Sequence, residues 1–179
     1  MNTPILTTDR LVIRAFTEAD LDIFTHYRAQ PEVAKYQSWS DYIYADALAL
    51  FNNADYANFA VVGQWYQLAI ADIDSDQLPG DLAVHFIDNE QIEIGFTVAP
   101  ENQKKAIGKE AVSAFLEYLF NTLNKHRVVA TTDAENVASF RLLESLGFRR
   151  EAHFRQNVFF KGAWGDEFQY AMLRAEHQP

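Results

Sequence analysis

The sequence predicts a mixed α/β (α+β) fold with one central sheet, and three observations point to it. The chain has 179 residues, of which 49% are apolar, so it suits a single domain over residues 1–179 with a sizeable core. Segments with the alternation of strands and segments with helical periodicity follow one another. Their order is strand, helices, three strands, helix, strand, helix and two strands, which is not the regular alternation of a doubly wound parallel sheet.

The first third of the chain predicts one strand and three helices. Thr17, followed three residues later by Asp20, is typical of a helix N-cap with an acidic third position. Proline is favoured in the first turn of a helix, and aspartate is favoured at its cap. The predicted elements are a strand over Arg10–Phe16, a helix over Glu18–Arg28, a short helix that opens at Pro31, and a helix capped by Asp41 that runs to about Asn53.

The remainder predicts further strands and two long helices. An acidic turn over Asp72–Asp81 joins the first two of these strands, and Gly147 is expected to end the second helix in the left-handed conformation. Residues 161–166, KGAWGD, are expected to form the turn of the last hairpin. The predicted elements are strands over Trp65–Ala71, Leu82–Ile87, Ile92–Val98 and Arg127–Thr132, helices over Ile107 to about Leu123 and Glu135–Leu146, and a hairpin of Arg149–Phe160 and Glu167–Leu173.

Composition excludes several classes of function. The chain has no cysteine, which removes disulfides, thiolate nucleophiles and cysteine metal sites and fits a reducing cytoplasm; its five histidines show no ligand spacing, so no metal is expected. No apolar run approaches the ~20 residues of a membrane span, and the start has no signal-peptide pattern. The net charge of -10 argues against nucleic-acid binding. We therefore expect a cytoplasmic protein with neither nucleic acid nor membrane as a partner, as a monomer or a homodimer.

Charge is distributed unevenly along the chain. Residues 31–101 hold twelve acidic residues and one basic residue, whereas residues 102–161 hold ten basic and six acidic residues. Both segments are compatible with ordinary solvated faces. The alternative interpretation is that the second half holds an anionic coenzyme and the first half attracts a cationic acceptor.

The segment Ile92–Ala111, IEIGFTVAPENQKKAIGKEA, predicts an anion site. It reads as a strand, a short loop with two lysines, and the start of a helix. The first-turn N–H groups of a helix are unpaired and the helix dipole favours an anion there, so this loop is suited to a phosphate. The run Gln103–Gly108 is neither a Walker loop nor a GxGxxG motif, because no GKS/T follows and the run holds only one glycine.

A second polar pair lies near the start of the next predicted helix. Asn136 and Ser139 are three residues apart and so share one face of that helix. Asparagine offers both a donor and an acceptor to an amide-bearing chain, and serine offers a hydroxyl to a leaving group. Either residue is also common as a simple helix cap.

Together these segments resemble the GNAT superfamily of N-acetyltransferases, in particular its RimJ/RimL-like branch of ribosomal-protein N-acetyltransferases. The resemblance covers nearly the whole chain and is carried by TDRLVIR, EIGFTVAPENQKKAIGKEA, ENVASFRLLESLGFRREAHFR and GDEFQYAML. It implies a mostly antiparallel, twisted mixed sheet of about seven strands, splayed in the middle and flanked by helices. It also implies acetyl-CoA as co-substrate and a protein or peptide N-terminus, or a small amine, as acceptor.

The family motif Q/R-x-x-G-x-G/A, which binds the pyrophosphate of acetyl-CoA, falls on Gln103–Gly108. The preceding strand is expected to pair its free backbone groups with the pantetheine arm. The coenzyme-binding residues that the resemblance implies are Phe96, Thr97, Val98, Gln103, Lys104, Lys105, Ala106, Ile107, Gly108, Lys109, Asn136 and Ser139.

This chain departs from the family pattern at two positions. Ala106 stands where the motif has its first glycine, and a methyl at that close backbone approach would weaken coenzyme binding or shift the loop unless the two lysines offset it by charge. Leu143 stands where many members carry a tyrosine that serves as general acid to the coenzyme thiolate. In the RimJ/RimL-like branch a serine on the same helix has that role, and Ser139 matches it.

The reaction that the resemblance implies is direct attack of an amine on the acetyl thioester in a ternary complex. Glu93, on the face of its strand opposite Ile92 and Ile94, is the candidate base, and a structural carboxylate is the alternative. At pH 7, deprotonation costs about 1 kcal/mol for an α-amine and about 4.6 kcal/mol for a lysine amine. This favours an N-terminal α-amine as the acceptor.

The acceptor pocket is expected between the early helices and the strands that follow. Its candidate wall residues are Tyr36, Trp39, Trp65 and Phe86, each of which could instead be a core aromatic. The alternatives to N-terminal acetylation are transfer to a polyamine, amino acid or antibiotic, a non-catalytic acyl-CoA-binding module, and a nucleotide-binding domain.

Overall fold

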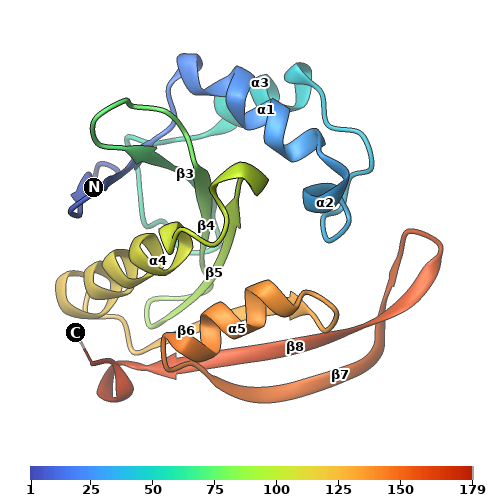
Figure 1. The fold of residues 1–179 in the computed structure, drawn as a ribbon. Helices are drawn as coiled ribbons and strands as arrows, with labels where there is room; N and C mark the ends of the chain where they lie inside the picture. The colour runs from blue at the N-terminus through green and yellow to red at the C-terminus, as the bar shows by residue number, and fades with distance from the viewer. Residues whose placement is uncertain (179) are drawn as a thin grey trace.

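One eight-stranded sheet forms the centre of the protein in a computed structural model that describes residues 1–178 (Figure 1). Its strand order is β1-β2-β3-β4-β5-β6-β8-β7, and every neighbouring pair is antiparallel except β5 and β6. The strands are β1 (Leu6–Thr7), β2 (Leu11–Ala15), β3 (Trp65–Asp72), β4 (Gly80–Phe86), β5 (Gln91–Val98), β6 (Arg127–Asp133), β7 (Arg149–Phe160) and β8 (Ala163–Leu173).

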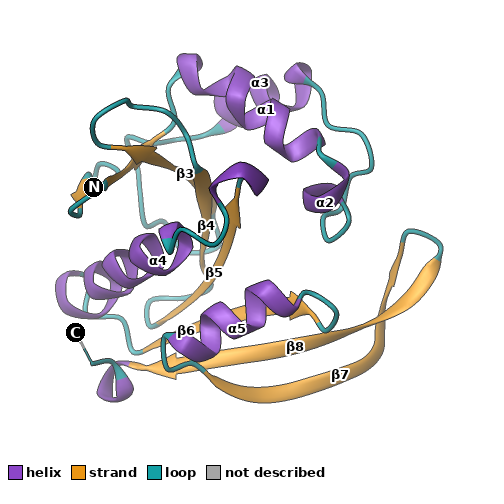
Figure 2. Ribbon diagram, in the orientation of Figure 1, coloured by secondary structure: helices purple, strands orange, loops and turns teal. Residues whose placement is uncertain are grey.

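Helices cover both faces of this sheet (Figure 2). Apolar residues of α1 and α3 pack on one face, whereas α4 and α5 pack on the other. A short π-helical stretch, Tyr118–Thr122, continues α4. The helices are α1 (Leu21–Ala29), α2 (Pro31–Ala34), α3 (Tyr44–Asn53), α4 (Ile107–Glu117) and α5 (Val137–Ser145), with single 3-10 turns at Glu18–Asp20, Pro100–Asn102 and Arg174–Glu176.

The sheet opens between β5 and β6. These two strands pair in parallel over only three positions, Gln91–Glu93 against Arg127–Val129, and their ladder ends there. Figure 1 shows that β3–β5 and β6–β8 then run in different directions. The splay that the resemblance implied is therefore present, and it leaves the last residues of β5 without a strand partner on the β6 side.

Two predicted details of the first half need correction. The sheet has eight strands rather than about seven, because the two-residue strand Leu6–Thr7 pairs with β2 and is too short to show alternation. Asp41 does not cap the third helix. The cap position is Ile43, whose N–H donates to the Asp46 carboxylate (3.0 Å). The free N–H group at the helix start is thus paired by an acidic residue inside the first turn and not by Asp41.

Two further corrections concern turns. Asp81 belongs to strand β4 and not to the preceding acidic turn, since the strand begins at Gly80. The last hairpin turns at Lys161 and Gly162, both with positive φ, so its second strand begins at Ala163 rather than at Glu167.

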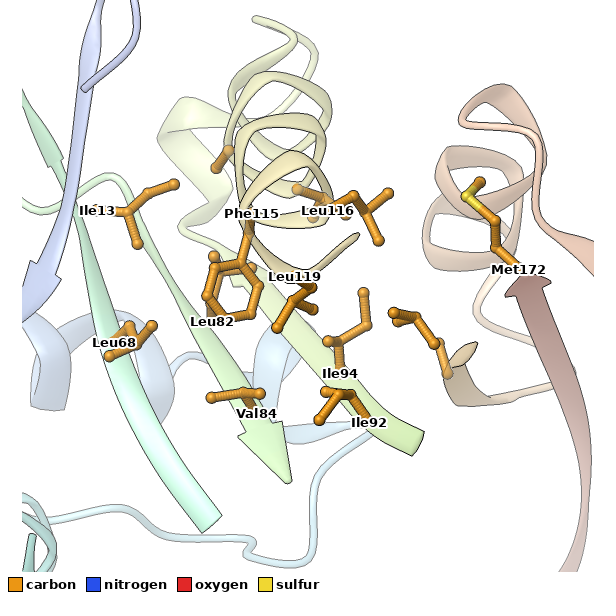
Figure 3. Packing of buried hydrophobic residues seen from close by; sticks show 14 of the residues in the cluster. Ile13, Leu68, Leu82, Val84, Ile92, Ile94, Phe115, Leu116, Leu119 and Met172 are labelled. Carbon is orange, nitrogen blue, oxygen red and sulfur yellow. The ribbon is translucent and has the colours of Figure 1, made fainter. Parts of the chain in front are cut away.

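The main core lies between α4 and the centre of the sheet. Helix α4 and its π-helical continuation present Phe115, Leu116 and Leu119 to apolar side chains of β3, β4 and β5, among them Ile92 and Ile94 (Figure 3). All of these side chains are buried. This packing fixes α4 on the sheet, and Gly108 at the start of the helix lies close to Val98 at the end of β5, so the loop that joins the two elements is held at both ends.

We expect Leu119→Ala to lower the free energy of unfolding by about 2–5 kcal/mol, because it removes a fully buried side chain and leaves a cavity. Urea unfolding followed by circular dichroism measures this loss. Ile23→Ala, which truncates a partly exposed apolar side chain on α1, is the control, and its cost should stay within about 0.5 kcal/mol. Equal losses in the two variants would contradict the assigned core.

Candidate active site

Two cavities meet where β5 and β6 diverge. The larger, about 740 Å³, runs between the loop before α4 and the start of α5. The smaller, about 240 Å³, lies between the diverging strands and reaches towards α1. Residues from three segments line both cavities and so mark their junction: Tyr36, Gln37, Phe96, Thr97, Asn136 and Ser139.

The loop before α4 offers free backbone donors to the larger cavity. No hydrogen bond found among residues 1–178 uses the N–H groups of Lys104, Lys105 or Ala106. Lys104 and Ala106 both adopt the left-handed conformation, with φ of 61° and 62°. Left-handed residues on either side of Lys105, which is not left-handed, turn successive N–H groups towards one point. Together with the positive end of α4, these N–H groups form an anion-binding nest.

Close packing holds this nest in place. A Cβ atom built on Gly108 would lie 2.8 Å from Leu142 Cδ1 and 3.2 Å from Val98 Cγ2, so any larger residue would force these two side chains on α5 and β5 to shift. The Gln103 side chain donates to the Val98 carbonyl (3.2 Å) and ties the loop back to the strand. The predicted coenzyme residues Val98, Gln103, Lys104, Ala106, Ile107, Gly108 and Lys109 all line the larger cavity.

Lys105 points elsewhere. Its ammonium donates to Asn102 (3.1 Å), its carbonyl accepts from Arg10 (3.1 Å), and it lines a separate hollow on the α1 side of the loop. The basic side chains that do line the larger cavity are Lys104, Lys109 and Arg141. The lysine contribution to this cavity therefore comes from one loop residue and one residue of α4, and not from the adjacent pair.

Asn136 and Ser139 lie at the junction of the two cavities. Asn136 is the N-cap of α5, and its side-chain oxygen accepts from the Ser139 N–H (3.2 Å). Among the described residues no hydrogen bond engages the Ser139 hydroxyl. Leu143 is buried one turn further along α5 and also lines the smaller cavity. Ser139 is thus the hydroxyl on α5 that faces both spaces.

A buried polar network lies at the inner end of the smaller cavity. Asp81 accepts hydrogen bonds from Arg28 (3.1 Å) and Gln67 on Oδ1 and from the Tyr27 hydroxyl on Oδ2. Burial alone would lower the pKa of the Arg28 guanidinium, but the adjacent Asp81 carboxylate raises it. Burial and the same carboxylate raise the pKa of Tyr27 well above its usual value, so this phenol stays protonated.

Aromatic rings support Arg28 from one side. Its guanidinium lies over Phe24, Trp39 and Tyr42, at 4.3, 4.6 and 5.5 Å from the ring centres. Trp39 also donates its indole N–H to the Arg28 carbonyl (3.0 Å). Trp39 therefore does not line the smaller cavity but backs a residue that does.

The other three predicted wall aromatics have different positions. Tyr36 lines both cavities, and its hydroxyl donates to the Glu135 carbonyl (3.3 Å) across the open side of the sheet. Phe86 is fully buried in the core. Trp65 is 55% exposed and stacks on His85, away from both cavities.

Glu93 lies near the closed end of the splay, in the last β5 position that still pairs with β6. Its carboxylate is 3.7 Å from His85 Nδ1, and it lines neither cavity. The carboxylates that line the smaller cavity are Asp81, Asp133 and Glu167. Because Glu93 does not line either cavity, it can accept a proton from an amine bound there only through intervening water.

Arg28, Gln67 and Asp81 are the cavity residues that sequence reasoning missed. Arg28 closes a predicted helix, Gln67 sits in a predicted strand, and Asp81 ended a run of acidic turn residues. No local pattern connects them, since they lie 39 and 14 positions apart and meet only through packing of α1 on β3 and β4. Within residues 1–178, no group of three potential ligand side chains is placed to hold a metal, and no helix is long and apolar enough to cross a membrane.

We expect Ala106→Gly to stabilise the protein by about 0.5–1 kcal/mol, because an alanine in the left-handed region is strained whereas a glycine is not. Removing the methyl should also tighten CoA binding, measured by calorimetry. Ala60→Gly is the matched control, because Ala60 has a φ of 68° and lies outside both cavities. A comparable gain in CoA affinity in both variants would contradict a role of Ala106 at the coenzyme loop.

Comparison with known proteins agrees with this geometry. Residues 10–149 match the acetyltransferase (GNAT) domain family. The chain is 33% identical over 175 residues to the uncharacterized N-acetyltransferase YnaD of Bacillus subtilis, covering 96% of this chain and 98% of the relative. A GNAT-family acetyltransferase structure from Bacillus anthracis superposes with a TM-score of 0.86 at 28% identity, covering 97% of this chain and all of that one.

Two more distant relatives have named acceptors. Spermidine N-acetyltransferase from Vibrio cholerae, solved with CoA and spermine, has a TM-score of 0.81 at 22% identity, over 94% of this chain and 98% of that one. The ribosomal protein uS5 alanine N-acetyltransferase of Escherichia coli is 28% identical over 86 residues, which is 48% of this chain and 44% of that protein. The family model, the full-length relative and the splayed sheet together show that this chain belongs to the GNAT family of acetyl-CoA-dependent N-acetyltransferases.

Proposed function

We propose that this enzyme acetylates the α-amine of an amino-terminal residue, with acetyl-CoA bound in the larger cavity and the acceptor in the smaller one. The single observation that carries the proposal is the junction of the two cavities at Ser139. A reaction between a coenzyme thioester and an amine needs one place that both reach, since the reacting atoms must approach to about 3–3.5 Å.

The loop geometry supports a position for each part of the coenzyme. The nest of Lys104–Ala106 and the start of α4 suits the pyrophosphate, because N–H groups and the helix dipole both favour an anion. The backbone of Phe96–Val98, without a strand partner on the β6 side, suits the amide groups of pantetheine. A chain laid along this path brings the thioester to the cavity junction.

Ser139 is then placed to act on the leaving group. Its hydroxyl has no partner among residues 1–178 and lies on the α5 face that lines both cavities. A hydroxyl that donates a hydrogen bond to the departing sulfur stabilises the thiolate as the C–S bond breaks. Leu143 has no polar group, so it cannot donate a hydrogen bond to the departing sulfur. A different residue at the junction has to do so.

The choice of an α-amine follows from the carboxylates near the junction. Asp81 already accepts three hydrogen bonds and pairs with Arg28, and Glu93 lies outside both cavities. Asp133 and Glu167 also line the smaller cavity, but carboxylates are weak bases and no histidine lines it among residues 1–178, which favours an amine that loses its proton easily. Reaching the neutral form at pH 7 costs an α-amine about 1 kcal/mol and a lysine-type amine about 4.6 kcal/mol.

One observation favours a second acceptor class, a polyamine. Asp133 and Glu167 line the smaller cavity from β6 and β8 in addition to Asp81, whereas Arg28 is the one cationic side chain that lines it among residues 1–178. An acceptor with a second ammonium group would be attracted to this surface. The relatives include both a spermidine N-acetyltransferase and a ribosomal-protein alanine N-acetyltransferase, so both classes of acceptor belong in the same assay.

CoA release tests the function directly. The protein has no cysteine, so a thiol reagent reports only the CoA that turnover releases. We expect peptides with a free amino terminus to be acetylated faster than their N-blocked counterparts that contain lysine, and faster than spermidine. Faster turnover with spermidine would show that the acceptor is a polyamine and not an amino-terminal residue. No CoA release with any amine would refute both proposed acceptors.

We expect Ser139→Ala to lower kcat by about 100-fold with the KM for acetyl-CoA little changed, because the hydroxyl acts on the leaving sulfur in the transition state. Ser113→Ala, on α4 and outside both cavities, is the matched control. Steady-state kinetics at saturating acceptor measure the effect. Undiminished turnover in Ser139→Ala would remove this residue from the mechanism.

A further inference from the structure

We propose that Asp81 binds the acceptor amine, with its Oδ2 atom accepting a hydrogen bond from the amine N–H while the nitrogen attacks the thioester. This inference rests on the acceptor site of the proposed function and adds the residue that orients the amine. Four features of the described residues support it.

The first feature is position. Asp81 on β4 pairs with Thr97 on β5, and both residues line the smaller cavity, with Thr97 also at the junction. The two strands approach closely here, since a Cβ on Gly80 would lie 2.3 Å from the Thr97 carbonyl oxygen. Asp81 is therefore held next to the strand segment that is expected to carry the end of pantetheine.

The second feature is access from one direction only. Asp81 is 1% exposed, yet it forms part of the cavity lining together with Arg28 and Gln67. An amine at the inner end of the smaller cavity therefore lies beside this residue, whereas the outer surface of the protein offers no approach to it. A purely structural ion pair does not require a cavity that ends on it.

The third feature is a vacant acceptor position. An ionised carboxylate has about four lone-pair sites. Arg28 and Gln67 occupy the two on Oδ1, and Tyr27 occupies one on Oδ2. One site on Oδ2 is therefore without a donor among residues 1–178.

The fourth feature is charge balance. The Arg28 guanidinium cancels the Asp81 charge, and the Nε atom of Arg28 is buried without a hydrogen-bond partner among residues 1–178. The charged or titratable groups around Asp81 are Tyr27, Arg28 and Tyr42 on the α1–α3 side, and Asp133 and Glu167 across the cavity. A neutral amine that enters therefore meets a paired carboxylate, which orients the lone pair of the nitrogen without holding the amine as a strongly bound ammonium.

The chemical step balances without a further reactant. The nitrogen lone pair forms the N–C bond to the acetyl carbon, and the C–S bond breaks with its electron pair on sulfur. The proton that nitrogen loses leaves along the hydrogen bond to Asp81 and passes to water in the cavity. The thiolate takes one proton from solvent, so the products are the acetamide and the CoA thiol.

Asp81→Asn tests this role with the amine that the wild-type enzyme acetylates fastest. The amide cannot accept in the same way at that site, and we expect kcat/KM for the amine to fall at least 100-fold. CoA affinity, measured by calorimetry, should stay within threefold of wild type, because the larger cavity is untouched. If Asp81 had only a structural role, its replacement would lower kcat/KM for the amine and the affinity for CoA together.

The single variant leaves Arg28 buried without its counter-ion and so can fail to fold. The double variant Arg28→Gln/Asp81→Asn avoids an unpaired charge and should show the same split between amine kinetics and CoA affinity. Arg14→Gln/Asp20→Asn is the matched control, since it removes another pair with a buried carboxylate (2.7 Å) that lines neither cavity. This control should retain kcat/KM within threefold.

Folded Asp81 variants with kcat/KM within threefold of wild type would overturn the inference while leaving the proposed function intact. Loss of CoA binding in parallel with turnover would also overturn it, since the residue would then act on the fold of the whole site. A wild-type enzyme that releases no CoA with any amine would instead refute the proposed function itself.

Discussion

The divergence of β5 from β6 is the constraint on which the rest of this structure depends. Three parallel residue pairs join the two strands, and beyond Glu93 they separate. A sheet that stays paired buries its backbone groups in the ladder, whereas a splayed one leaves N–H and C=O groups free along one edge. In this protein that edge lines both cavities, so the same feature creates the space between the strands and leaves backbone groups free beside it.

Contacts across the open side keep this splay in a defined shape. Tyr36 donates to the Glu135 carbonyl, and Lys161 at the hairpin tip donates to the Ala34 carbonyl. Both contacts join the segment around α2 to the β6–β8 half of the molecule. They involve flexible side chains and single hydrogen bonds, each worth about 1 kcal/mol, so they brace the cavity without locking it.

The elements with strong local signals were predictable. The capping pair Thr17 and Asp20, the amphipathic α4 and the left-handed Gly147 all follow from side-chain chemistry within a few residues. The cap of α3 and the exact length of the hairpin strands were predicted wrongly, because there several polar residues compete for the same role and tertiary packing selects one. The loop before α4 was predicted as a coenzyme site from its motif, since backbone donors ahead of a helix depend only on local sequence.

The sequence by itself determined the class of this protein, through an ordered set of motifs that resembles the GNAT family and a pattern of strands and helices that predicts a mixed sheet. Only the tertiary structure decided which side chains line the smaller cavity. Arg28, Gln67 and Asp81 come from three elements and acquire a common role when α1 packs across β3 and β4. Phe86 and Trp65 carry the same aromatic chemistry as Tyr36, yet the packing places one in the core and the other on the surface, because the face of a strand is set by register and not by residue type.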